Sequence, residues 1–156
     1  MNKHTYKFIG FIFLLFSVIE PLYSANYKFN TIKNGVAVYL GILPAEMIDG
    51  HKSQSMHGGI PPGMFRYHIA VALFDDSSGE RIKDARITVK LLDSKNNPIS
   101  EAKELEFMFI NKKLLYGNYL TVNRMGETYK IVATVEFKHN SYKGFEIITD
   151  YPFVHI

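Results

Sequence analysis

Residues 129–137, Tyr-Lys-Ile-Val-Ala-Thr-Val-Glu-Phe, decide the fold class of this chain. Most of them are β-branched or aromatic, the residue types that favour strands. Apolar side chains stand at every second position, and this spacing gathers them on one face of a strand. We therefore predict a β-strand whose inward face carries Tyr129, Ile131, Ala133, Val135 and Phe137.

Segments of the same kind recur along the chain, separated by the Gly, Pro, Asn, Asp and Ser residues that favour turns. They cover residues 36–43, 67–74, 82–92, 103–110, 115–122 and 145–149. About seven strands without a credible helix predict an all-β fold, an immunoglobulin-like β-sandwich. Residues 27–34 are a polar lead-in that we place outside this set of strands.

Turn residues refine this prediction. Residues 75–79 predict a hairpin between the strands on either side of them, and residues 123–126 predict a second one. The pair Gly117-Asn118 predicts a bulge or a tight corner. The residues expected between the two sheets are Ile69, Val71, Ile87, Val89, Ile131, Val135 and Phe137.

The first residues have the pattern of a secretory signal peptide. Lys3 and Lys7 precede a mostly apolar run over residues 8–19, which is too short for a confident membrane span. Cleavage near Ser24 predicts a signal peptide over residues 1–24, a single β-sandwich domain over 25–156, and a periplasmic or secreted protein. An uncleaved N-terminal anchor is the alternative.

Composition excludes several classes of function. The chain has no Cys, which rules out disulfides, cysteine-ligated zinc, a blue-copper centre and thiol catalysis. A formal net charge of +3 without a run of Lys or Arg does not favour a nucleic-acid partner. No hydrolase, metalloprotease, phosphate-loop or dinucleotide motif is present, so we expect a protein that is not an enzyme.

Residues 44–66 predict a long loop rich in Met, His, Gly and Pro. The stretch from Met47 to His68 holds three of the six methionines and three of the six histidines. Thioether and imidazole together suit copper, and imidazole also suits zinc or iron. A loop of about twenty residues in a small domain is usually functional or disordered. The alternative is a surface loop whose composition has no role.

The candidate metal ligands are His57, His68, Met56, Met64 and Met108. His68 begins a strand, a rigid position beside the loop, although a hydrogen bond to the backbone would also explain it. Met108 lies on the polar face of its strand with two glutamates, where ordinary packing is the alternative. We expect the bound metal to be a copper ion, with iron or zinc as alternatives.

Several short segments resemble small exported β-proteins of Gram-negative bacteria that are found with metal-handling genes. The segments are residues 57–59, 67–68, 72–75, 79–82, 84–85, 105–108 and 116–119. The resemblance implies a periplasmic immunoglobulin-like domain that binds copper or iron and has no catalytic residues. Similar proteins tend to have Pro where this chain has Phe107, which affects the geometry expected of Met108.

Two functions follow from these observations. The first is a metal-binding accessory or delivery module whose partner is a metal ion. The second is an immunoglobulin-like interaction or structural module without a metal, whose partner is another periplasmic or membrane protein.

Overall fold

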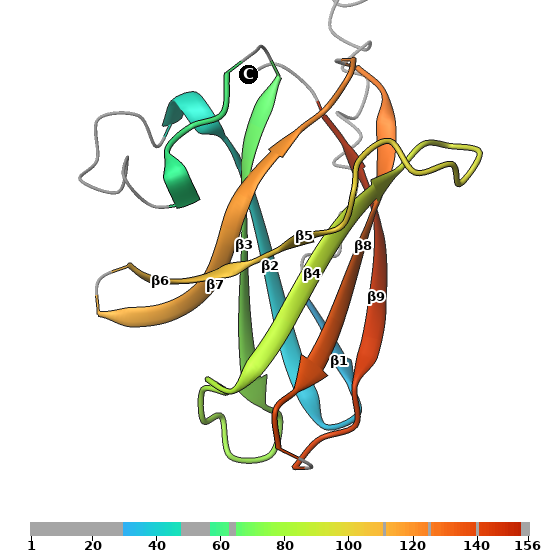
Figure 1. Cartoon of the computed structure of the whole chain (residues 1–156). Coiled ribbons are helices and arrows are strands. Elements are labelled where there is room, and N and C mark those ends of the chain that lie inside the picture. The colour runs from blue at the N-terminus through green and yellow to red at the C-terminus, as the bar shows by residue number, and fades with distance from the viewer. Residues whose placement is uncertain are drawn as a thin grey trace, which may run out of the picture.

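The alternating stretch forms β8 (Thr128–Phe137), one of the two inner strands of a four-stranded antiparallel sheet. The computed structural model describes residues 30–47, 57–62, 65–110, 112–124, 126–139 and 141–153. In the second sheet β8 pairs with its two long neighbours, and a short strand adds to the edge (Figure 1). The order of this sheet is β5 (Lys103–Glu104), β4 (Ala85–Leu92), β8 and β9 (Phe145–Pro152).

The first sheet has five strands and faces the second across the core. Its order is β1 (Asn30–Lys33), β2 (Val36–Pro44), β3 (Arg66–Asp75), β7 (Lys113–Thr121) and β6 (Glu106–Ile110). Neighbouring strands of this sheet all pair in the antiparallel direction. The all-β sandwich predicted from the sequence is therefore confirmed, with an immunoglobulin-like arrangement of two packed sheets.

The core lies where the alternation placed it. Six of the seven residues expected between the sheets are at most 1% exposed: Ile69, Val71, Ile87, Val89, Ile131 and Val135. Phe137 is only partly buried, because it ends β8 at the rim and packs against Tyr142 and Phe145. Adjacent strands therefore contribute to the core as their local pattern predicts.

A strand and its turn were missed at the start of the described chain. β1 lies within the lead-in that we expected to be irregular, and it pairs with β2 from Lys33 opposite Val36 to Asn30 opposite Tyr39. Asn34 and Gly35 join them with positive φ values of 52° and 77°. An Asn-Gly pair with this backbone is the preferred two-residue hairpin turn, so the local signal was present.

Both predicted hairpins are wrong, because their turns connect strands of different sheets. Residues 76–84 lead from β3 in the first sheet to β4 in the second, and residues 122–127 lead from β7 to β8. A single bridge between Phe74 and Arg81 is all that remains of the first expected pairing. A turn signal marks a reversal of direction, but it does not say whether the returning strand pairs with its predecessor or packs across from it.

The segment 103–110, predicted as one strand, is divided between the sheets. β5 pairs with β4, and β6 pairs with β7. Leu105 between them is 3% exposed and packs in the core. Burial of this leucine lets the chain pass from one sheet to the other, which local alternation could not reveal.

The loop predicted over 44–66 begins slightly later. Pro44 is the last residue of β2, and a short 3-10 helix, η1 (Ala45–Met47), follows it. Residues 48–56 and 63–64 lie outside the described part of the chain, as does the predicted signal peptide over 1–24. No helix of the described residues is long and apolar enough to cross a membrane.

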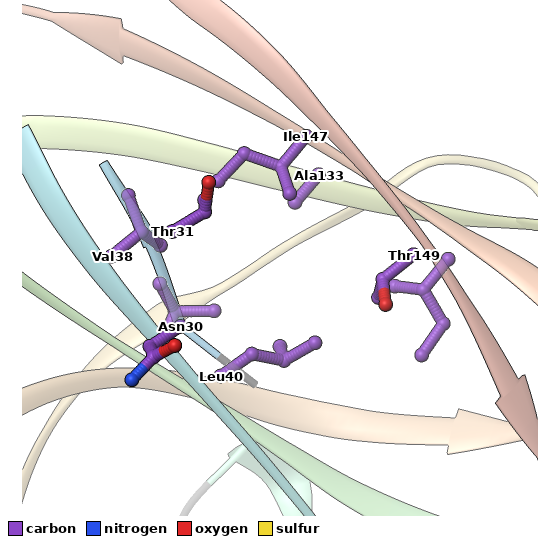
Figure 2. A pocket seen from close by; sticks show the side chains of 9 residues that line it. Asn30, Thr31, Val38, Leu40, Ala133, Ile147 and Thr149 are labelled. Carbon is purple, nitrogen blue, oxygen red and sulfur yellow. The ribbon is translucent and has the colours of Figure 1, made fainter. Parts of the chain in front are cut away.

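A small cavity lies between the sheets and is too small for a ligand. Its lining is mostly apolar and comes from both sheets (Figure 2): Asn30, Thr31, Val38, Leu40, Val71, Ile131, Ala133, Ile147 and Thr149. Its volume of about 20 Å³ accommodates roughly one water molecule. This cavity is therefore not a candidate ligand site.

Candidate metal centre

His68 lies on the outer face of the first sheet, the face directed away from the second sheet. Its neighbours Tyr67 and Ile69 belong to the core, so the side chain between them points the opposite way. His68 is nevertheless only 4% exposed. Other groups on the outer face must therefore cover its imidazole ring.

Gly117 on the neighbouring strand leaves the space in which this ring sits. In the sheet it pairs with Ala70 on one side and with Glu106 on the other, so all three lie on the outer face. A Cβ atom at Gly117 would meet the Sδ atom of Met108 first, then His68 Cε1 at 2.9 Å and Nε2 at 3.1 Å. The thioether and the imidazole therefore converge over one glycine.

Met108 reaches this point from β6. It is 3% exposed, whereas its neighbours Phe107 and Phe109 on the opposite face are 50% and 67% exposed. The sequence placed Met108 correctly on the face that carries Glu106. The Met108 side chain is buried against His68 and Gly117, an environment that fits either the predicted ligand role or the alternative of ordinary packing.

His57 covers the site from the loop. Its ring lies 5.6 Å from the His68 ring and 6.0 Å from the Tyr119 ring, measured between centroids. The side chain is 2% exposed, and its Nδ1 lies 3.0 Å from Glu106 Oε2. A left-handed backbone at His57, with φ of 60°, begins a run that continues through Gly58 and Gly59.

The second ring nitrogen of His57 is buried without a partner. Nε2 has no hydrogen-bond partner among the described residues. A buried polar atom left unpaired costs about 1–3 kcal/mol and therefore calls for an explanation. A cation bound at Nε2 is one, because a neutral imidazole nitrogen is a common metal ligand.

His68 is neutral under ordinary conditions. Burial, and secondarily the proximity of His57, lower its pKa to about 4. Imidazole must be neutral to bind a metal, so at neutral pH no proton has to leave this ring. The same buried environment disfavours a positive charge, including that of a metal ion, unless strong ligand bonds compensate for it.

The structure thus brings together three of the five predicted ligands. His57, His68 and Met108 converge on the outer face, while Met56 and Met64 lie outside the described residues. Within the described residues no group of three or more His, Asp or Glu side chains could hold a metal ion. The donor set that does assemble is two imidazoles and one thioether.

Three residues beside the proposed ligands were not predicted from the sequence to belong to this site. Glu106 could have been found, since it stands two positions before Met108 and so shares its face. Gly117 and Tyr119 depend on which strand lies between β3 and β6, information that no local pattern contains. Tyr119 packs edge-on against His68 with centroids 5.2 Å apart.

Comparison with solved structures shows a shared fold. The chain is similar to FetP of uropathogenic Escherichia coli strain F11 in a copper-bound form with a Glu-to-Gln substitution (TM-score 0.61, 15% identity, 81% of this chain and 95% of that chain). As-isolated FetP, expressed in the periplasm of E. coli, is also similar (0.60, 16%, 80% and 92%).

A third similar structure is a DUF4426 family protein from Pseudomonas aeruginosa PAO1 (TM-score 0.57, 14% identity, 81% of this chain and 95% of that chain). No family model matches the sequence, and no curated protein matches it. At these identities the comparison shows the shared fold alone. The match extends over nearly the whole length of each of the three solved chains.

Proposed function

We propose that this protein is an exported, periplasmic module that binds a copper ion between His57, His68 and Met108 and serves in metal storage or delivery. The observation that carries the proposal is the buried, unpartnered Nε2 of His57 beside a neutral His68 and the thioether of Met108. Similarity in fold to a copper-bound FetP adds support.

The donor chemistry favours copper over harder ions. Two imidazoles and a thioether are borderline and soft ligands, which suit copper and leave Mg²⁺ or Ca²⁺ without the oxygen atoms they need. Iron and zinc are the alternatives that imidazole also accepts. We include Met56 and Met64 as further thioether donors, since one adjoins His57 in sequence and the other precedes His68 by four residues.

The first test measures the metal content of the protein purified from a periplasmic extract. Titration of the metal-free protein with Cu(I), Cu(II) and Zn(II) then ranks the metals. We expect His57→Ala, His68→Ala and Met108→Ala each to lose tight copper binding, and Met56→Ala or Met64→Ala to weaken Cu(I) binding.

Matched controls come from the same chain. His139 also lies 3.0 Å from a carboxylate, that of Asp84, but its side chain is 75% exposed. Met47 is an exposed methionine of η1. His139→Ala and Met47→Ala should bind copper like the parent. Parental copper binding by the double variant of His57 and His68 would rule the site out.

A metal-free interaction module is the second candidate function. The edge strand β6 exposes Phe107 and Phe109, and exposed aromatic side chains on an unpaired edge favour contact with another protein. Light scattering of the parent and of Phe109→Ser tests whether this edge supports self-association. If the parent binds none of the three metals but self-associates, and Phe109→Ser does not self-associate, the interaction module replaces the metal-binding candidate.

A further inference from the structure

Glu106 holds one specific nitrogen of His57. Its Oε2 lies 3.0 Å from Nδ1, and the carboxylate side chain is 57% exposed while the imidazole is 2% exposed. An ionised carboxylate only accepts hydrogen bonds, so in this contact Nδ1 carries the proton and donates. In a neutral imidazole the other nitrogen, Nε2, then has a free lone pair.

We propose that Glu106 is a positioning residue for metal capture: it selects the tautomer and the ring orientation of His57 that present the Nε2 lone pair to the site shared with His68 and Met108. This inference rests on the proposed function. Nε2 is on the far side of the ring from Glu106, buried and without a partner in the described chain.

The strand that supplies the thioether also supplies the orienting group. Glu106 and Met108 are alternate residues of β6 and share its outer face, on either side of the position that Phe107 occupies on the opposite face. Gly117 stands directly across from Glu106 and carries no side chain. The carboxylate and the thioether are therefore set by one short strand, while His57 arrives from a loop.

A carboxylate behind a metal-binding histidine is a general means of raising ligand basicity and fixing the ring. The surface pair of His139 and Asp84 has the same 3.0 Å separation without this consequence, because its imidazole is 75% exposed. Solvent can pair with either nitrogen there. Burial of His57 is what turns an ordinary hydrogen bond into control of the lone pair.

The tautomer of His57 in the metal-free protein is the first measurement. Long-range ¹H–¹⁵N correlation spectra distinguish protonated from unprotonated ring nitrogens, and the spectrum of His57→Ala assigns the signals. We expect Nδ1–H in the parent and in Glu106→Gln, whose amide oxygen still accepts. Glu106→Ala should shift His57 toward the Nε2–H form, while His139 is unchanged.

The second measurement is the Cu(I) affinity, determined by competition with a chromophoric chelator. Glu106→Ala should bind about 10- to 100-fold more weakly than the parent, as is typical when such a partner is removed. Glu106→Gln should recover most of that loss. The control is Glu104→Gln, because Glu104 pairs with Arg86 and lies outside the site.

Two results would overturn the inference while the proposed function stands. One is an unchanged His57 tautomer in Glu106→Ala. The other is a Glu106→Gln variant that loses copper as completely as His57→Ala, which would make Glu106 a ligand itself. If the parent protein binds no copper, that result would instead refute the proposed function, and the proposed role of Glu106 in metal capture would be refuted with it.

Discussion

Replacing Gly117 by Ala adds one methyl group at the point where the proposed ligands meet. The backbone tolerates the change, because Gly117 does not have a left-handed φ. The new Cβ would stand 2.9 Å from His68 Cε1 and 3.1 Å from Nε2, and closer still to Met108 Sδ. Ordinary contacts begin at 3.4 Å, so the His68 ring must retreat by 0.5 Å and Met108 by more.

These shifts set the expected loss of affinity. A metal or catalytic site must hold its groups within about 0.5 Å of the working geometry, and a displacement of about 1 Å costs up to roughly 100-fold. With two of three ligands displaced, we expect Cu(I) affinity to fall about 10- to 100-fold, equivalent to about 1.4–2.7 kcal/mol. Folding should be affected less, because Ala is about 0.5–1 kcal/mol better than Gly within a strand.

Gly41 supplies a matched control. It lies on the same row of the outer face, opposite Ala70, which in turn is opposite Gly117. A Cβ there would meet only Ala70 O at 3.9 Å. Gly41→Ala therefore repeats the chemistry of the substitution at a distance from the ligands, and it should bind Cu(I) like the parent.

The assay combines chelator competition for Cu(I) with urea unfolding of the metal-free variants. Weak copper binding by Gly117→Ala, with stability within about 1 kcal/mol of the parent, supports the site. Parental affinity in this variant would refute the reasoning that His68 and Met108 act together over Gly117. Equal losses in Gly41→Ala would show that the sheet, rather than the ligands, responds to the substitution.

Three further results are expected. The folded-state pKa of His68 is about 4, below the usual 6.5, so the unfolded chain binds more protons than the folded one between these two pH values. The contribution of His68 to stability, up to about 3 kcal/mol, is therefore present above pH 6.5 and is lost as the pH falls toward 4. Urea unfolding of the metal-free protein across this pH range should show this loss of stability in the parent and not in His68→Ala. Ile131→Ala should cost about 2–5 kcal/mol in the same assay, whereas the partly buried Phe137 should cost less than a fully buried Phe; a loss below about half a kcal/mol at Ile131 would contradict the assigned register. Protein from a periplasmic extract should begin near Ala25 by N-terminal sequencing, and full-length protein in the membrane pellet would indicate an anchor instead.

The site shows how far local patterns extend. The alternation around Met108 placed it on one face with Glu106, and the start of β3 placed His68 on a rigid strand, both correctly. The same alternation could not show that Leu105 carries the chain between sheets, or that the outer face is covered at His68. The exposure of a side chain depends on which groups pack over its face of the sheet. At His68 these groups include His57, which comes from a loop, and the conformation of a loop does not follow from a repeating hydrophobic pattern.

By itself the sequence determined the fold class, most strands and their core-facing residues, because a strand's two faces are set by residues two positions apart. It also supplied the candidate metal ligands, the imidazole and thioether groups of His57, His68, Met56, Met64 and Met108. Only the tertiary structure decided that β7 lies between β3 and β6, so that Gly117 separates His68 from Met108, and that Glu106 reaches His57. Such pairings depend on how whole faces pack together, and that balance is not contained in any single stretch of the chain.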